Sequence, residues 1–549
     1  MPLRVVPMGG LGEIGMNSLL FDDGVSALLV DAGLMFPDDT MLGIDYVVPD
    51  FSALRDAAQR LNGLLLTHGH EDHIGAVPFL LREYDLPVYG TRLTLGLLRH
   101  RLGEQGIDGA RLHPITRDAR FRVGRFEVEA YPVCHSIPDA VGYVLRCDEG
   151  VFVHTGDFKI DPFPLDGVPT ALARLREISA REGVTALFSD STNVEHEGTS
   201  LPERFVGEAL SEIFRQAPGR VIVAMFSSNL HRVQEALKAA GACGRRVALC
   251  GKSMVRNVAT AIDLGYLALP RPDILLPVEE ASALPDSAVA VITTGSQGEP
   301  RSALTLMALG EHKHVRIREG DTAVLSSKFI PGNERAIAAV INRLFLAGAD
   351  VLYEKISEVH VSGHGSREEL AAMIDAVRPA HFIPVHGEPR LLIRHRRLAE
   401  ANGVPSTAMV LNGDILEFSG GAMSRAGRTE VGHFFVDGKG VGEVGSTVLK
   451  DRAHLSQVGM VIVVLALSSA TGEILYGPDI ITRGVVTENG DEGLADGARD
   501  EVLRTLEDSG AASRTDLTEM QAAIRQAVRR YFNRRLERKP MIVPVLMEL

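Results

Sequence analysis

Tryptophan is absent from the sequence, cysteine is rare, and positive charge is in the minority. There are 57 lysine and arginine residues against 71 aspartate and glutamate residues, which gives a formal net charge of −14. This balance excludes a basic surface over the whole molecule, so a polyanion could bind only in a local basic channel. Aromatic residues make up only 5% of the sequence, which argues against an extended surface for stacking nucleic-acid bases.

The four cysteines do not pair as C-x-x-C, and four in 549 residues do not form a disulfide framework. The chain reaches Gly9 before a long apolar run forms, which predicts no signal peptide. The longest apolar stretch towards the C-terminus, Met460 to Leu467, is far shorter than the roughly 20 residues that cross a bilayer. We therefore expect a cytoplasmic protein with reduced thiols and no membrane partner.

The chain has the length and composition of a multidomain globular protein. Its 549 residues correspond to three or four domains at roughly 150 residues each. Hydrophobic residues make up 45% and charged residues 23%, which argues against a disordered, collagen-like or coiled-coil chain.

Short apolar strands dominate the first 190 residues, and each is followed by a polar or ionisable residue. The strands are predicted at 26–30, 63–66, 126–131, 151–154 and 185–188, and they lead to Asp31, His68, His135, Asp157 and Asp190. A sheet whose strands end in this way presents a site on its rim, where loops carry the chemistry.

The region from about 200 to 360 alternates between helices and strands. Helices are predicted at 203–215 and after Asn229, and strands at 220–226, 246–250, 288–292 and 322–325. This alternation is typical of a parallel α/β domain.

The C-terminal part begins with a glycine-rich region after about residue 420, which is interpreted as a linker or turn region. Residues 455–549 then predict a small α/β module that contains an acidic stretch, 491–508, and a basic helix, 517–539. The arginines of the basic helix could contact RNA, but we favour a solvated face or pairing with the acidic stretch.

The sharpest chemical signal is the segment His68-Gly69-His70-Glu71-Asp72-His73. Three histidines and an aspartate within six residues, directly after a strand, are difficult to explain by packing. Clustered imidazoles would repel one another when protonated, and burying them unpaired is costly. A shared metal ion removes both problems, and imidazole with carboxylate is a ligand set expected for Zn²⁺ or Mn²⁺.

Four further residues, Asp31, His135, Asp157 and His386, each follow a predicted apolar strand. Any one of them alone is more typical of a capping or core residue. All four together, beside the metal loop, supply the additional ligands that a second metal ion needs.

These residues resemble the motifs of the metallo-β-lactamase superfamily, whose signature is matched by His68-x-His70-x-Asp72-His73. The resemblance implies an αββα sandwich that binds two divalent metal ions, Zn or Mn, with Asp31 behind the ligands to orient them. The implied ligands of the first ion are His68, His70 and His135, those of the second are Asp72, His73 and His386, and Asp157 bridges the two ions.

About 230 residues separate Asp157 from His386, far more than one connection within a sheet needs. Within this stretch, 189–193 and 360–365, together with His386, resemble motifs A, B and C of the β-CASP nucleases. The resemblance implies that Asp190 and His364 form a catalytic pair beside the metal ions and Asp72. His364 would protonate the leaving oxygen or hold the phosphate, and Asp190 would set its tautomer and raise its pKa.

Three loops rich in glycine or serine in the same region are candidates for a phosphate track. Ser366-x-x-Glu369 predicts a capping box after the motif B glycines, and a turn of this kind exposes backbone N–H groups to an anion. Ser227-Ser228, between a strand and a helix, is the second candidate, with a plain helix N-cap as the alternative. The turn at 293–300 is the third, with an ordinary tight turn as the alternative.

Longer stretches narrow the resemblance to the ribonuclease J family of β-CASP proteins. They are Met8 to Asn17, Thr67 to Ala76, Gly156 to Lys159, Thr294 to Pro300 and Val385 to Glu388, and the similarity covers essentially the whole chain. The resemblance implies a ribonuclease of RNA maturation and decay, a 5′→3′ exonuclease that favours single-stranded 5′-monophosphate RNA, with some endonuclease activity. The implied phosphate-binding residues are Ser227 and Ser228 for the 5′-phosphate, and His360, Val361, Ser362, Gly363 and His364 for the adjacent phosphate.

The same resemblance implies a homodimer or tetramer formed through the C-terminal module, and partner proteins in RNA decay. It also implies a structural Ca²⁺-like ion at Gly43, Asp45 and Asp437, although each of these aspartates is equally typical of a turn.

The predicted fold is α/β, with four segments. They are a split αββα metallo-β-lactamase sandwich (1–200 and 366–425), an inserted β-CASP α/β domain (201–365), a linker (426–454) and a C-terminal α/β dimerisation domain (455–549). The alternatives are a small-molecule ester or thioester hydrolase of the superfamily, a DNA-directed β-CASP nuclease, and a non-catalytic RNA-binding subunit. The long insertion argues against the first, and the complete ligand set argues against the last.

Overall fold

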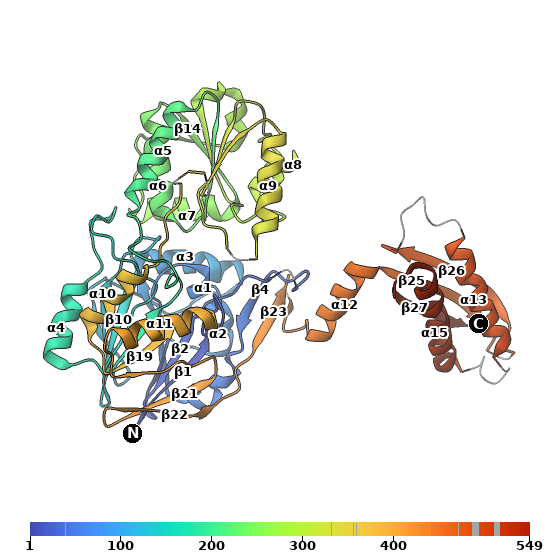
Figure 1. Ribbon diagram of the computed structural model, residues 1–549, viewed down its shortest axis with the longest axis horizontal. Coiled ribbons are helices and arrows are strands. Elements are labelled where there is room, and N and C mark those ends of the chain that lie inside the picture. Colours follow the sequence, from blue (N-terminus) through green and yellow to red (C-terminus); the bar gives the residue numbers. More distant parts are fainter. Residues whose placement is uncertain are drawn as a thin grey trace. The chain divides into compact units, whose positions relative to one another are not determined.

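The computed structural model describes residues 1–549 apart from positions 39, 331, 355, 358, 439, 470, 486–492 and 510–515. Its contacts divide the chain into two compact units (Figure 1). Unit 1 comprises Met1–Phe36 and Tyr46–Phe434, and unit 2 comprises Pro37–Asp45 and Phe435–Leu549.

Two mixed β-sheets pack face to face in unit 1. The first sheet has the order β22 (Ala422–Arg428), β21 (Asp414–Ser419), β1 (Leu3–Gly9), β2 (Ser18–Asp22), β3 (Ala27–Val30), β5 (Leu61–Leu65), β6 (Val88–Thr91) and β7 (Leu112–Ile115). The second has the order β20 (Ser406–Thr407), β19 (His381–Val385), β12 (Ala186–Asp190), β11 (Gly150–His154), β10 (Val141–Cys147), β9 (Phe126–Pro132) and β8 (Arg120–Val123). The two sheets share a core that includes the fully buried Phe21, Phe126, Tyr143, Phe152 and Phe188.

Helices accompany both sheets on their outer sides. The elements that follow strands of the first sheet are β4 (Tyr46–Pro49), the 3₁₀ helix η1 (Phe51–Arg60), α1 (Glu71–Ile74), α2 (Val77–Glu83) and α3 (Arg92–Glu104). Those that pack on the second sheet are α4 (Leu172–Glu182), α10 (Arg367–Val377) and α11 (Pro389–Ala401). The predicted αββα sandwich is therefore confirmed.

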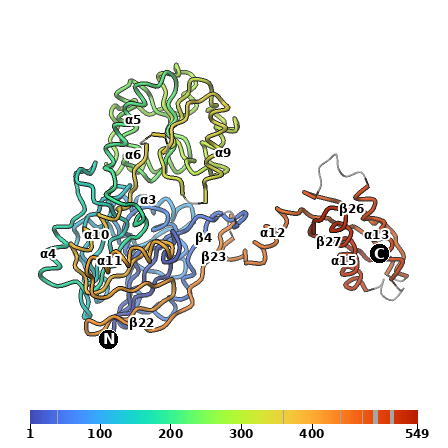
Figure 2. The backbone as a smooth tube through the Cα atoms, in the orientation of Figure 1, coloured from blue at the N-terminus to red at the C-terminus, as the bar shows by residue number. Residues whose placement is uncertain are grey.

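A third sheet lies in the chain between β12 and β19. Its order is β15 (Leu275–Leu276), β14 (Arg246–Cys250), β16 (Val289–Thr293), β13 (Val221–Ala224), β17 (Thr322–Leu325) and β18 (Asp350–Tyr353), and all pairs are parallel. Its helices are α5 (Arg204–Gln216), α6 (Leu230–Ala242), α7 (Lys252–Asp263), α8 (Ala303–Leu309) and α9 (Glu334–Leu346), with 3₁₀ turns η2 (Val278–Ala283) and η3 (Asp286–Ala288). The predicted parallel α/β insertion is thus confirmed, and Figure 2 shows the green to yellow path that forms it.

The insertion begins and ends at one rim of the sandwich. β12 and β19 are neighbouring parallel strands, with Asp190 opposite Val385. The chain returns from the insertion through residues 360–365, and α10 then runs back so that β19 ends beside β12. Two segments almost 200 positions apart therefore meet where the metal loop lies.

Unit 2 is built on a three-stranded sheet of order β26 (Ile474–Arg483), β25 (Met460–Leu467) and β27 (Met541–Glu548). Helices α13 (Leu494–Asp508) and α15 (Leu517–Leu536) pack on one face of it, around Val463, Val502 and Phe532. The segment 426–454, which its glycines predict to be a linker, contains β23 (His433–Asp437), β24 (Gly440–Val441) and most of α12 (Ser446–Val458).

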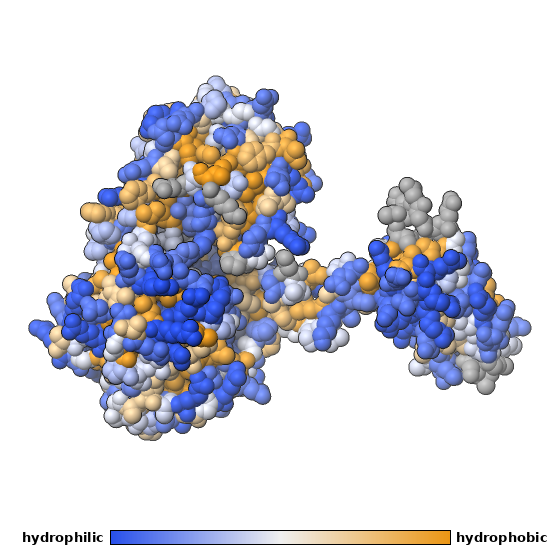
Figure 3. Space-filling view, in the orientation of Figure 1, coloured by the Kyte–Doolittle hydropathy of each residue, from blue (hydrophilic) through white to orange (hydrophobic). Residues whose placement is uncertain are grey.

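The basic helix predicted at 517–539 is α15, and it ends at Leu536 because Glu537 adopts a left-handed backbone conformation. Arg534 pairs with Glu501 of α13 at 3.3 Å, which is one of the two favoured alternatives for this helix. Residues 491 and 492 of that stretch lie outside the described residues. The face of unit 2 visible in Figure 3 is mostly hydrophilic.

Among the helices of the described residues, none combines the length and the apolar character that crossing a membrane requires.

Candidate metal centre

Strand ends of the sandwich bring the predicted ligands to one rim. His68 follows β5, Asp157 follows β11 and His386 directly follows β19, while His135 lies beyond β9 and Asp31 directly follows β3. Apart from His70 and Asp72, whose side chains are partly exposed, these residues are buried. Residues from five places in the sequence therefore form one buried group.

The first ligand cluster consists of His68, His70, His135 and Asp157. His70 Nδ1 lies 3.0 Å from His68 Nε2 and 3.1 Å from His135 Nε2. Asp157 Oδ2 lies 3.7 Å from the Nε2 atoms of His68 and His135. One ligand atom from each of the four residues lies within 4.8 Å of the others, which is close enough to share an ion.

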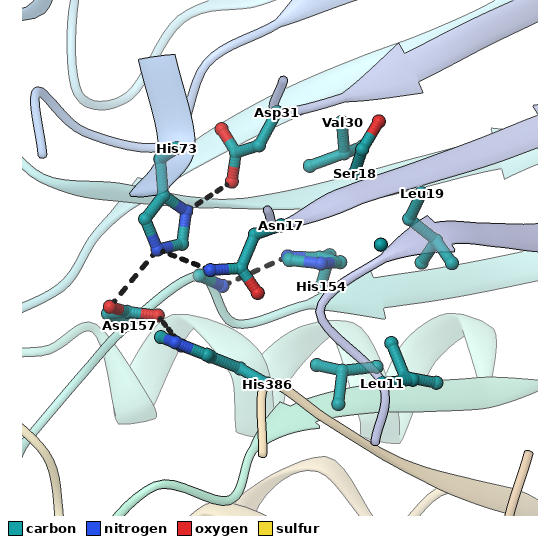
Figure 4. Close-up of a pocket in the computed structure, with 13 residues that line it drawn as sticks. Leu11, Asn17, Ser18, Leu19, Val30, Asp31, His73, His154, Asp157 and His386 are labelled. Atoms are coloured by element: carbon teal, nitrogen blue, oxygen red, sulfur yellow. Dashed lines mark hydrogen bonds and ion pairs between the residues drawn. The ribbon is translucent and has the colours of Figure 1, made fainter. Parts of the chain in front are cut away.

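The second cluster consists of Asp72, His73, Asp157 and His386. His73 Nε2 lies 3.2 Å from Asp157 Oδ2 and 3.5 Å from Asp72 Oδ2. His386 Nδ1 lies 2.8 Å from Asp157 Oδ1, and its Nε2 lies 3.5 Å from Asp72 Oδ2. Figure 4 shows His73 between Asp31 and Asp157, with His386 at the other oxygen of Asp157. Asp157 thus belongs to both clusters.

The donor atoms of these clusters fit divalent metal ions. His135 Nδ1 donates to the carbonyl oxygen of Gly363 at 2.8 Å, so its Nε2 carries a lone pair that faces His70. His386 Nε2 is buried and has no hydrogen-bond partner. A buried nitrogen without a partner is costly, and a cation shared among these lone pairs would satisfy it.

Two contacts behind the ligands fix their orientation. Asp31 Oδ2 lies 2.8 Å from His73 Nδ1, and Asp31 itself accepts hydrogen bonds from the backbone and hydroxyl of Thr67. The Gly363 carbonyl holds His135 in the same manner. In both cases the Nδ1 atom carries the hydrogen and the Nε2 atom faces the cluster, as a metal ligand requires.

The backbone at this rim is tightly constrained. Asp31 and His386 both adopt positive φ angles, 62° and 53°, where side chains other than glycine are strained by about 1 kcal/mol or more. A Cβ atom at Gly33 would lie 1.6 Å from the carbonyl oxygen of Asp72, and one at Gly363 would lie 2.9 Å from His135 Cε1. Glycine at these two positions therefore lets the metal loop (residues 68–73) and the return loop (residues 360–365) approach their neighbours.

Electrostatics favour the metal-binding protonation states of the histidines of the first cluster and of Asp157. Burial and repulsion by neighbouring imidazoles hold the pKa values of His68 and His135 well below the ordinary range. Burial lowers the pKa of His70 to about 4. Burial opposes ionisation of Asp157, but His386 and His73 outweigh it and hold its pKa well below the ordinary value. Neutral imidazoles and an ionised carboxylate are the forms that bind a cation at neutral pH. In the second cluster burial opposes protonation of His73 and His386, but Asp157 outweighs it and raises their pKa values, so a bound ion would have to displace a proton there.

Asp190 and His364 lie together beside the second cluster, as expected for motifs A and B. His364 Nδ1 is 2.7 Å from Asp190 Oδ2 and 3.9 Å from Asp157 Oδ2. Burial opposes protonation of His364, but Asp190 and Asp157 outweigh it and raise the pKa of His364 to about 9. The His364 side chain is 21% exposed and that of Asp72 is 29% exposed, whereas His73 is 2% exposed. The open side of the centre therefore lies at His364 and Asp72.

The predicted phosphate-binding residues lie in two loops. Ser227 and Ser228 are half-buried between β13 and α6, where Asn257 Nδ2 lies 3.2 Å from Ser227 Oγ, and Asn229 caps α6. In the return loop, the backbone N–H of His364 donates to Ser362 Oγ at 3.1 Å. The capping box of Ser366 and Glu369 is present, as predicted.

An arginine lies where a structural cation is expected. Arg452 Nη2 contacts Asp437 Oδ2 at 2.5 Å, and a Cβ atom at Gly43 would lie 2.8 Å from Arg452 Nη1. Asp45 Oδ2 accepts a hydrogen bond from the backbone of Gly438. A guanidinium thus already supplies positive charge here, and the ion at Gly43, Asp45 and Asp437 stays a prediction.

Two residues at the centre have no role in the sequence-based predictions. Asn17 Nδ2 lies 3.1 Å from His73 Nε2 and 3.2 Å from the backbone oxygen of Asp72. Thr67 supports Asp31, as described above. Asn17 lies in a stretch whose only sequence signal is its resemblance to a family, and Thr67 is marked only by its place just before the metal loop.

Models of four protein families match the chain. They are the β-lactamase superfamily domain over residues 26–209, the ribonuclease J β-CASP domain over 218–344, the Zn-dependent metallo-hydrolase RNA specificity domain over 348–409 and the ribonuclease J C-terminal domain over 447–549. In a crystal structure of a protein of unknown function from Enterococcus faecalis V583, all of that chain matches 76% of this one at a TM-score of 0.52 and 14% identity, a likeness of fold alone.

Relatives match the chain over its full length. Ribonuclease J2 of Bacillus subtilis is 38% identical over 100% of this chain and 99% of its own. Ribonuclease J of Thermus thermophilus is 39% identical, over 100% of this chain and 95% of its own length. Ribonuclease J of Mycobacterium tuberculosis is 40% identical, over 100% of this chain and 97% of its own length. At this identity and coverage, the chain belongs to the ribonuclease J family.

Proposed function

We propose that this protein is a metal-dependent ribonuclease that degrades RNA from the 5′ end, favours a 5′-monophosphate and also cleaves internally. The observation that carries the proposal is the pair of ligand clusters that share Asp157, with Asp190 and His364 at their open side. Membership of the ribonuclease J family and the match to an RNA specificity domain support RNA as the substrate. The preference for the 5′ end rests on the family resemblance.

The proposal assigns two divalent ions, Zn²⁺ or Mn²⁺, to the centre. His68, His70 and His135 would hold the first, Asp72, His73 and His386 the second, and Asp157 both. When bound, such ions activate water as a nucleophile and stabilise charge on phosphoryl oxygens. Asp31 keeps His73 oriented by its hydrogen bond to Nδ1.

His364 acts as the proton donor in this mechanism. Asp190 engages its Nδ1 atom, so Nε2–H is available for the oxygen that leaves the phosphorus. Asp190 is held in turn by the backbone N–H and hydroxyl of Thr192. A fixed carboxylate behind the imidazole stabilises its protonated form and its orientation.

In this proposal the RNA lies between the sandwich domain (1–200 and 366–425) and the inserted domain (201–365). Ser227 and Ser228 would bind the 5′-phosphate at the carboxyl end of β13. His360, Val361, Ser362, Gly363 and His364 would contact the next phosphate. The Ser227 loop lies at the carboxyl end of a strand of the parallel sheet, where such sheets place their ligand sites.

Digestion of one RNA with three different 5′ ends tests the proposed function. The RNA carries a 5′-triphosphate, monophosphate or hydroxyl, and each form is incubated with enzyme loaded with Zn²⁺ or Mn²⁺. We expect mononucleotides to be released in order from the 5′ end, fastest from the monophosphate form. Products are separated on sequencing gels and by mass spectrometry.

Two further substrates distinguish the proposed function from a DNA-directed nuclease and from a thioester hydrolase. DNA of the same sequence and an acyl thioester are tested with the same enzyme, and a His73→Ala preparation controls for contaminating nuclease. Hydrolysis of the thioester without RNA cleavage, or equal rates on DNA and RNA, would contradict the proposal.

We further propose that unit 2 forms a homodimer, or a tetramer, through the face of its sheet opposite α13 and α15. Ile481, Val545 and Met547 are 40%, 40% and 43% exposed, although they lie on a well-formed sheet. Ile462 is paired with Ile481 on one side and with Val543 on the other. A continuous apolar sheet face of this kind is typical of a protein–protein contact.

A charge in this face is expected to weaken association. Val545→Asp should shift the mass in light scattering towards the 59.2 kDa monomer, because burying an unpaired carboxylate costs several kcal/mol. The matched control is Gln526→Asp, an equal change of charge at an exposed position of α15. Equal masses for the wild type and both variants would contradict this interface.

A further inference from the structure

Arg232, in the first turn of α6, is a buried cation without a role in the reaction described above. Only 1% of its surface is exposed. Arginine stays charged in proteins and is rarely buried unless it is fully paired. The contacts of Arg232 therefore indicate what its burial achieves.

The guanidinium of Arg232 joins three separate segments. Its Nε and Nη2 atoms donate to the two carboxylate oxygens of Glu203, just before α5, at 2.8 and 3.2 Å. Nη1 donates to the carbonyl oxygen of Ser326, after β17, at 2.8 Å. The third segment is the return loop, where Nη2 donates to the Val361 carbonyl oxygen at 3.3 Å and Nη1 lies 2.9 Å from His360 Nδ1.

The last of these contacts fixes the tautomer of His360. Arginine has only donors and keeps its protons, so His360 Nδ1 must be the acceptor and the ring hydrogen must be on Nε2. Burial, Arg232, Lys328 and Lys159 hold the pKa of His360 well below its ordinary value, which favours the neutral ring. His360 as a residue is partly exposed. At neutral pH it therefore offers one hydrogen-bond donor, Nε2–H, and no charge.

The return loop is held at both ends. Arg232 holds His360 and Val361, whereas the Gly363 carbonyl accepts from His135 and His364 contacts Asp190. Three residues separate His360 from His364. Two imidazole donors, one neutral and one cationic, thus stand on one short, fixed segment next to the metal centre.

We propose that Arg232 is a positioning residue that fixes His360 as a neutral Nε2–H donor to a phosphate oxygen of the RNA. The proposal rests on the proposed ribonuclease function for the identity of the ligand, but the tautomer of His360 can be measured without RNA. Arg232 acts only through His360 and the return loop, because its own donors are engaged inside the protein.

The test compares two buried arginine–carboxylate pairs of the same domain. Arg220 binds both oxygens of Asp321, at 2.8 and 2.5 Å, and its side chain is 5% exposed. It precedes β13, at the opposite end of the strand from Ser227. Arg232→Gln and Arg220→Gln each leave a buried carboxylate without its cation, so both should lose stability, but only the first should change the return loop.

The first measurement is the ¹⁵N chemical shift of the His360 ring in histidine-labelled, metal-loaded protein, assigned by comparison with His360→Asn. We expect a protonated Nε2 and an accepting Nδ1 that do not titrate between about pH 6 and 8 in the wild type and in Arg220→Gln. In Arg232→Gln we expect mixed tautomers and titration within that range.

The second measurement is the kinetics on 5′-monophosphate RNA. Arg232→Gln and Arg232→Lys should raise KM by roughly 10-fold with a smaller change in kcat, since one hydrogen bond to a charged group is weakened. Arg220→Gln should stay within about twofold of the wild type.

A hydrogen on His360 Nδ1 in the wild type would overturn the proposal, as would equal changes of KM in Arg232→Gln and Arg220→Gln. Absence of RNA hydrolysis in the wild type, with the expected tautomer present, would overturn the proposed function and the ligand of His360 but not the positioning by Arg232. If Arg232→Gln does not fold, the wild-type ring shifts and Arg232→Lys still decide.

Discussion

Replacing His73 by alanine is expected to abolish RNA hydrolysis while the sandwich stays folded. His73 Nε2 lies 3.2 Å from Asp157 and 3.5 Å from Asp72, so its loss removes a ligand of the second cluster. We expect metal content to fall from about two ions per chain to about one, and the rate to fall by roughly a thousandfold or more. Metal mass spectrometry and cleavage of labelled RNA measure the two effects.

Two further variants separate metal loss from general damage. Asp31→Asn removes the negative charge behind His73 and weakens the hydrogen bonds at Oδ2, which His73 and the Thr67 hydroxyl share, so metal affinity should fall by roughly 10- to 100-fold. His381→Ala removes a buried histidine at the start of β19, the strand that His386 follows, where its ring contacts the Gly421 carbonyl at 2.9 Å. It should lower stability but leave the metal content unchanged. Native turnover by His73→Ala, with contaminating nuclease excluded, would refute the metal mechanism.

The metal loop could be predicted from the sequence because its ligands are local. His68 to His73 form a loop after β5 that runs directly into α1, so no tertiary information is needed to bring these side chains together. The apolar strands before Asp31, Asp157 and His386 gave a weaker signal, which became informative only because all of them point to the same rim.

The contacts across the insertion could not be predicted from local patterns. Asp190 meets His364 because β12 pairs with β19 across the whole inserted domain, and residue spacing does not encode that pairing. Asn17 and Arg232 carried no chemical signal, since a lone asparagine or arginine is usually on the surface. The contact of Arg452 with Asp437 at the expected cation site was equally unpredictable, because the sequence does not reveal which guanidinium lies against Asp437.

Replacing His364 by alanine is expected to lower the rate on RNA by roughly 10²- to 10⁴-fold without loss of metal. The imidazole of His364 is 2.7 Å from Asp190 and 3.9 Å from Asp157, and it is partly exposed at the open side of the centre. As a proton donor it must be protonated, so its contribution is present below its pKa and is lost as the pH rises through that value.

The pH profile distinguishes this role in the wild-type enzyme. Asp190 and Asp157 raise the pKa of His364 to about 9, and bound divalent ions would repel the imidazolium and lower this value. As the pH rises, kcat should therefore decrease with a midpoint at or below about pH 9. Asp190→Asn removes the nearest carboxylate and should move this decline to lower pH by about one unit or more. Glu129→Gln, a change at another buried and paired carboxylate, is the control and should leave the profile unchanged.

Two substrates with different leaving groups distinguish proton donation by His364 from phosphate binding by His364. An alkoxide leaves RNA slowly without a proton, whereas p-nitrophenolate leaves readily without one. If His364 donates the proton, His364→Ala should be severely impaired on RNA but nearly normal on a nucleoside 5′-p-nitrophenyl phosphate. If it mainly binds the phosphate, both substrates should suffer equally, because each presents the same phosphoryl oxygens to the imidazole. Equal losses on the two substrates would therefore reassign His364 from acid to phosphate ligand and leave the metal clusters as the source of catalysis.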